Sequence, residues 1–136
     1  DQRKANQFSF GSHCAWSEGD DVAHILWRGN VSADDIKAGA EIFERVPNRE
    51  KGFYLVIHVA ELGVLSPDAR VAITKDPRSA WVRQSIVVGA PFHVRVVMGM
   101  VTKALFALRV NKAAMFFMES DAAVEAHIAR ARANLS

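Results

Sequence analysis

The chain has 136 residues, of which 50% are hydrophobic and 24% are charged, and its net charge is +2. A chain of this length forms one domain that buries roughly two thirds of its unfolded surface. The small net charge, without a run of basic residues, argues against a nucleic-acid-binding protein. Cys14 is the single cysteine, which excludes an internal disulfide and a cysteine-only zinc site and suits the reducing cytoplasm.

The sequence predicts no membrane span, because no uninterrupted run of about 18 apolar residues is present. The chain starts at Asp1 rather than at a methionine, and we expect an upstream segment to have been removed. Residues 1–7 are polar and are expected to form a frayed leader, which leaves residues 8–136 as one domain.

The domain is predicted to open with a β-hairpin. In residues 8–16 the apolar side chains share one parity, as in a half-buried strand: Phe8, Phe10, Cys14 and Trp16. Residues 18–21 (EGDD) indicate a turn. Residues 22–29 then form the second strand of the hairpin, with Ala23, Ile25 and Trp27 on one side.

The middle of the chain predicts a helix, a buried strand and a second helix. Ser32 and Asp35 resemble a capping box, and the helix that they begin ends at Pro47. Residues 53–59 (FYLVIHV) are almost continuously apolar, which is typical of a central parallel strand covered on both faces. Ser66, followed by proline and aspartate, starts a helix that is expected to end near Asp76.

The last third repeats this alternation. Residues 86–88 predict a buried strand, residues 89–91 a turn, and residues 92–109 a long helix. A further strand over 113–118 precedes a final helix capped by Ser120. The element order is therefore β-β-α-β-α-β-α-β-α, which predicts an α/β domain. Its sheet should have five strands and be mostly parallel, with an antiparallel strand from the N-terminal hairpin.

This element order, together with three stretches, resembles the STAS family and, more narrowly, its bacterial SpoIIAA-like branch (STAS/SEC14). The stretches are residues 54–66 (YLVIHVAELGVLS), 86–95 (IVVGAPFHVR) and 116–123 (FFMESDAA). The resemblance covers residues 8–135 and consists of apolar patterns and caps, which specify a fold better than an activity.

The resemblance implies a non-enzymatic regulatory or protein-interaction module of the bacterial cytoplasm, similar to the anti-sigma factor antagonists. The related CRAL-TRIO fold implies an alternative, a carrier or sensor of a small hydrophobic or lipid-like ligand. Antagonists carry a phosphorylatable serine just inside the helix after the central strand. Here Asp68 falls at or beside that position, so the phosphoacceptor is either absent or is Ser66, one or two positions earlier.

Two predicted helix starts form a candidate ligand or partner site, because open α/β sheets bind ligands at the carboxyl ends of their strands. The first start contributes Ser66, Asp68 and Arg70, and the second contributes Gly89, His93 and Arg95. The alternative is purely structural: Ser66 caps a helix, Asp68 complements its dipole, and the second start is a tight turn beside an exposed arginine.

The long helix carries more apolar residues than one core-facing stripe needs. The surplus residues Val96, Met100 and Phe106 suggest a homodimer interface, a lipid-lined cavity or contact with a membrane surface, and burial by neighbouring loops is the alternative. In the carrier hypothesis, Met98 and Val101 join Met100 and Phe106 around the cavity, and Arg95 lies near its mouth.

The five histidines form no metal-binding motif, and neither a cofactor nor a metal ion is expected. His13 and His24 could face each other across the hairpin beside Cys14, but paired strand histidines are usually packed rather than metal-bound. A catalytic triad of His58 with Ser66 and Asp68 is rejected, because no nucleophile elbow is present and His58 ends a strand predicted to be buried. The sequence therefore predicts no enzyme.

Overall fold

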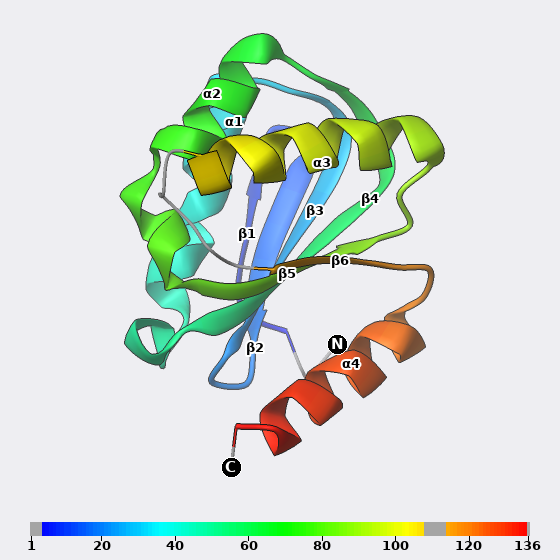
Figure 1. Cartoon of the computed structure of the whole chain (residues 1–136). Helices are drawn as coiled ribbons and strands as arrows, with labels where there is room; N and C mark the ends of the chain where they lie inside the picture. Colours follow the sequence, from blue (N-terminus) through cyan, green and yellow to red (C-terminus); the bar gives the residue numbers. More distant parts are fainter. Residues whose placement is uncertain (1–3, 108–113, 136) are drawn as a thin grey trace.

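The computed structural model describes residues 4–107 and 114–135; beyond Met100 in the helix that ends at Ala107, it describes the backbone and only the Lys103 side chain. The described chain is an α/β domain with one mixed sheet of six strands in sequential order (Figure 1). The strands are β1 (Ala5–Phe10), β2 (His13–Glu18), β3 (Val22–Val31), β4 (Phe53–Leu65), β5 (Val82–Val88) and β6 (Ala114–Met118). Neighbours from β3 to β6 are parallel, whereas β1–β2 and β2–β3 are antiparallel.

The prediction of a single strand over residues 8–16 is wrong. The chain turns at Gly11 and Ser12, so that Phe10 pairs with His13 and the sheet gains a sixth strand. Gly11 has a φ of +60°, the left-handed conformation that such two-residue hairpin turns require. The turn also reverses the side-chain faces, because Phe10 packs edge-on against the core residue Trp27 while Trp16 lies on the opposite face of the sheet.

Part of the expected leader is also ordered strand, since β1 begins at Ala5. Asn6 has a φ of 56° and donates a side-chain hydrogen bond of 3.0 Å to the buried hydroxyl of Ser17. This side-chain bond attaches the start of β1 to β2.

Four α-helices follow the caps that the sequence contains. They are α1 (Ala33–Gly39), α2 (Pro67–Lys75), α3 (Phe92–Ala107) and α4 (Asp121–Ala133). The Ser32–Asp35 capping box forms in both directions, and Ser66 and Ser120 each accept a hydrogen bond from the backbone N–H three residues later. Short 3-10 helices span Ala40–Arg45, Arg49–Lys51 and Pro77–Trp81.

The single helix predicted to reach Pro47 is therefore interrupted, because α1 ends at Gly39 and continues as a 3-10 helix. A β-carbon at Gly39 would lie 3.0 Å from the ring of Phe10 and 3.1 Å from that of Trp27. Glycine thus allows the helix to approach the hairpin closely.

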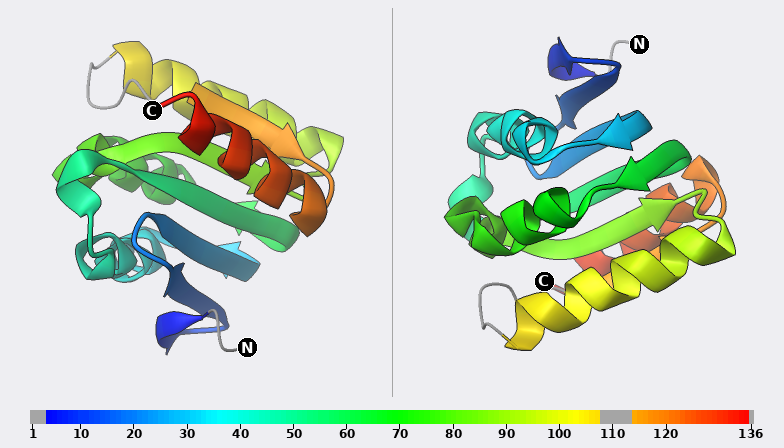
Figure 2. Two further views of the ribbon diagram at one scale, coloured as in Figure 1. Left: turned by 90° about the horizontal axis from the view of Figure 1, so that it is seen from below. Right: turned by 90° about the horizontal axis from the view of Figure 1, so that it is seen from above.

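The sequential strand order decides which face each helix covers. Right-handed connections between successive parallel strands that always step in the same direction place every connecting helix on the same face. Accordingly α1, α2 and α3 lie on one face of the sheet, and α4, which follows the last strand, lies on the other (Figures 1 and 2).

Each face has its own core. The larger core, beneath α1–α3, includes Ile25, Trp27, Phe43, Phe53, Val87 and Met98. The smaller core, beneath α4, consists of Val22, Tyr54, Val56, Ile86, Val88, Val124 and Ile128. Residues 53–57 and 86–88 contribute side chains to both cores, which confirms that these are two-faced central strands. No helix in the described part of the chain combines the length and apolar character that crossing a membrane requires.

Candidate functional sites on the two faces of the sheet

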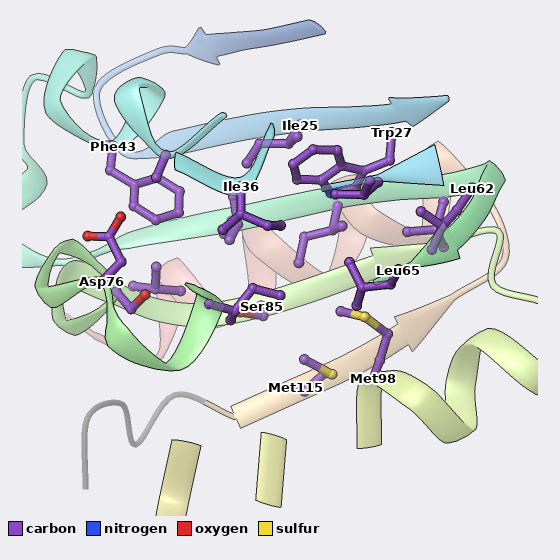
Figure 3. A pocket seen from close by; sticks show the side chains of 18 residues that line it. Ile25, Trp27, Ile36, Phe43, Leu62, Leu65, Asp76, Ser85, Met98 and Met115 are labelled. Atoms are coloured by element: carbon purple, nitrogen blue, oxygen red, sulfur yellow. The ribbon is translucent and has the colours of Figure 1, made fainter. Parts of the chain in front are cut away.

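An apolar cavity of about 100 Å³ lies between the sheet and the three helices that cover it (Figure 3). Trp27, Phe43, Met98 and Met115 are among its walls, and nearly all the other walls are aliphatic. Among the described residues that line it, only Asp76, Ser79 and Ser85 carry hydroxyl or carboxyl groups. The predicted lining residue Met98 is therefore in place, whereas Met100 is half exposed and the side chains of Val101 and Phe106 lie outside the described residues.

The outer face of α3 carries an apolar stripe in solvent. Phe92, Val96 and Met100 are 81%, 47% and 51% exposed, and their spacing of four residues places them on one side of the helix. Val94 and Met98 on the other side are buried in the larger core. Two of the three residues predicted to form a surplus apolar surface are therefore exposed, and the side chain of the third, Phe106, lies outside the described part.

The first predicted helix start is explained by capping. The Ser66 hydroxyl accepts a hydrogen bond of 3.1 Å from the backbone N–H of Ala69. Asp68 is exposed in the first turn of α2. The Nε of Arg70 is buried and has no hydrogen-bond partner among the described residues.

The second predicted helix start lies at the beginning of α3. Gly89 has a φ of +77° and donates its backbone N–H to the carbonyl of Met118. His93 is exposed. Arg95 donates from Nε to the carbonyl of Ala90 at 3.2 Å, and its guanidinium lies 5.8 Å from the ring centre of Phe117. These contacts direct the arginine toward its own helix start and β6.

The structure does not bring the two helix starts together. The β4–β5 ladder ends at His58 and Val88, so Gly89 follows immediately and lies against Ala60. Strand β4 continues beside β3 as far as Leu65, and the six residue steps from Ala60 to Ser66 span about 20 Å at the usual rise of a strand. A single cradle built from both loops is therefore not formed.

The opposite face of the sheet contains a groove that the sequence did not predict. It lies between α4 and strands β2–β4, has a volume of about 610 Å³, and is called the α4 groove below. Figure 2 shows that α4 lies over the β5–β6 side of this face. Its lining includes Lys4, Trp16, Glu18, Val22, His24, Leu26, Val56, His58, Asp121, Val124, Glu125, Ile128 and Arg132.

A hydrogen-bonded chain of three side chains lies in this groove. The Nε2 of His24 is 2.8 Å from the carboxylate of Glu18, and its Nδ1 is 3.0 Å from the Nε2 of His58. We assign a proton to Nε2 of each ring, because a carboxylate can only accept and Nδ1 of neutral His24 must then accept from His58. This leaves Nδ1 of His58 as an acceptor with no partner among the described residues.

The Trp16 ring stacks on both imidazoles, with centroids 4.8 Å from His24 and 5.5 Å from His58. Burial, and then the charge of His24, lowers the pKa of His58 to about 4. Burial is also the largest cause of the lowered pKa of His24, against the opposing effect of the bond to Glu18. Both imidazoles are therefore neutral near pH 7.

His13 and His24, which could have faced each other across a hairpin, lie on opposite faces of the sheet. Trp16, not His13, pairs with His24, and His13 points into the larger core, where its Nδ1 accepts from the backbone N–H of Arg28 at 2.9 Å. Within the described residues no group of three or more His, Cys, Asp or Glu side chains could hold a metal ion.

The sequence contained one signal for the groove. His58 interrupts the apolar run of residues 53–59, and a polar side chain in such a run needs a partner. Its partner, His24, is 34 positions away, and only the register of β3 on β4 brings the two together.

Neither the protein-family models nor the curated proteins compared with this chain gave a match.

Proposed function

We propose that this protein is a non-enzymatic interaction module of the cytoplasm that associates with a second copy of itself through the exposed stripe of α3. The observation that carries this proposal is the row formed by Phe92, Val96 and Met100, with Phe92 81% exposed. Large apolar side chains that are contiguous in solvent mark interaction surfaces more often than isolated ones do. The resemblance to SpoIIAA-like proteins supports the same class of function.

A second copy is the occupant that the stripe suits best. Val96 is the middle of three apolar positions spaced four residues apart, so a two-fold axis at Val96 would pair Phe92 of each copy with Met100 of the other. Rows of side chains at this spacing are the ridges that interdigitate when two helices cross. Arg95 lies beside the stripe but is directed to Ala90 and Phe117, which removes its charge from the centre of such a contact.

The oligomeric state tests the proposal. Size-exclusion chromatography with light scattering should give a mass of about twice the 15.0 kDa of the chain. Val96→Glu and Met100→Glu should each yield monomers, because a buried unpaired charge costs several kcal/mol. Val71→Glu is the matched control, since Val71 is 48% exposed on α2 and lies outside the stripe. A monomeric wild-type protein at high concentration, or a dimer that survives both α3 variants, would refute the proposal.

A second candidate function, carriage of a small hydrophobic molecule, is favoured by the cavity of Figure 3. Its volume of about 100 Å³ is smaller than the roughly 150 Å³ of an engineered apolar cavity that holds benzene. A lipid-sized ligand would therefore require α3 to move away from the sheet. Native mass spectrometry of freshly purified protein should show a retained ligand if this function holds, and the bare chain mass alone would count against it.

A further inference from the structure

Several hydrogen-bond acceptors line the α4 groove. The unpaired Nδ1 of His58 is one, the carboxylate of Asp121 is a second, and Glu18 offers the oxygen that does not bind His24. Asp121, His24 and His58 line the same groove. A ligand that satisfies these groups must supply donors rather than acceptors.

The positive charges that line the groove are already engaged. Arg132 donates from Nε to the carboxylate of Asp21 at 3.0 Å, and a second bond joins the same two side chains. Lys4 places its ammonium 4.2 Å from the centre of the Trp16 ring, within the range of a cation–π interaction. An ammonium group of the protein itself thus lies on the aromatic wall of this groove.

Most of the remaining groove lining is apolar, which indicates an apolar body for the ligand. Aliphatic side chains from the sheet and from α4 line the groove: Val22, Leu26, Val56, Val124 and Ile128. The volume of about 610 Å³ lies within the range of roughly 300–1,000 Å³ that is usual for small-molecule sites. A ligand with a cationic donor group at one end and an apolar body at the other would therefore complement both parts.

We propose that the α4 groove binds a small primary amine with an apolar or aromatic body. Its ammonium donates to Nδ1 of His58 and to the carboxylate of Asp121, and its body lies along the aliphatic part of the groove. Glu18 and His24 hold the His58 ring in the tautomer that accepts. Lys4 competes with the ligand, because its own positive charge lies in the same groove. This site is on the face opposite α3 and does not depend on self-association.

Titration calorimetry of the full chain with three probes of similar shape tests the ligand class. The probes are 2-phenylethylamine, neutral 2-phenylethanol and anionic phenylacetate, each at concentrations up to about 10 mM, which detects even weak affinities of about 1 mM. The amine should bind at least about tenfold more tightly than the alcohol, and the acid should not bind. Equal binding of all three probes, or no binding of the amine, would overturn the proposal.

Three variants test the placement of the ligand. Asp121→Asn should weaken amine binding about tenfold, a loss of about 1.4 kcal/mol. Asp68→Asn is the matched control, because Asp68 and Asp121 each occupy the first turn of a helix behind a serine cap. Lys4→Gln should tighten binding several-fold by removing the competing charge. Weaker binding in Lys4→Gln, or equal losses in the two aspartate variants, would refute the site.

Discussion

His58 links the stability of the fold to pH. The pKa of His58 is about 4 in the folded protein, whereas the ordinary value for histidine is 6.5. Between these values the unfolded chain binds a proton that the folded chain does not bind, so the free energy of unfolding falls as the pH drops. The lowered pKa of His24 acts in the same direction. The contribution of the pair to stability is fully present above about pH 6.5 and is lost toward pH 4.

We expect urea denaturation to show a decrease of about 2–3 kcal/mol in the free energy of unfolding between about pH 7 and pH 4.5, since one pKa unit corresponds to about 1.4 kcal/mol. His58→Gln should flatten this dependence. His93→Gln replaces an exposed histidine and should keep the wild-type slope. An unchanged slope in His58→Gln would assign the pH dependence to other groups.

At the scale of single elements, two glycines should respond to alanine in opposite directions. Gly11 has a φ of +60° in the β1–β2 turn, where a β-carbon is strained, so Gly11→Ala should destabilise the protein by about 1–2 kcal/mol. Gly99 lies inside α3, and a β-carbon there would meet no atom of the described residues within 4 Å. Gly99→Ala should therefore stabilise the protein by about 0.5–1 kcal/mol. Thermal unfolding of the two variants measures both shifts, and two changes of the same sign would contradict the turn or the helix.

The elements also differ in how far their sequence predicts them. Serine caps predicted the starts of α1, α2 and α4, because a cap is a local hydrogen bond within four residues. The second half of β4 was missed, since residues 60–64 are largely exposed and their strand conformation depends on pairing with β3. The turn at Gly11 was missed because apolar residues alternate on both sides of it, which resembles one continuous strand.

At the scale of the whole molecule, the sheet should depend on burial from both sides. Ile86 and Val87 are adjacent, both fully buried, and belong to the core beneath α4 and the core beneath α1–α3 respectively. Ile86→Ala and Val87→Ala should each lower the free energy of unfolding by roughly 2–4 kcal/mol in denaturant titrations. A neutral result for either one would mean that its face of β5 is not covered.

The parallel strands and the order of the helices followed from local patterns, but the α4 groove could not. Its walls come from β2, β3, β4 and α4, and its position depends on which half of one face a single helix covers. No local pattern encodes that choice, because it results from the strand order of the complete sheet.

The same strand order has a consequence for biosynthesis. Each strand lies beside the one that was translated just before it, from β1 through β6. Each new strand of a nascent chain can therefore pair with the edge strand that has already formed. No later strand has to insert between two earlier ones. Domains emerge slowly compared with local folding events, so this protein can grow its sheet one strand at a time during translation.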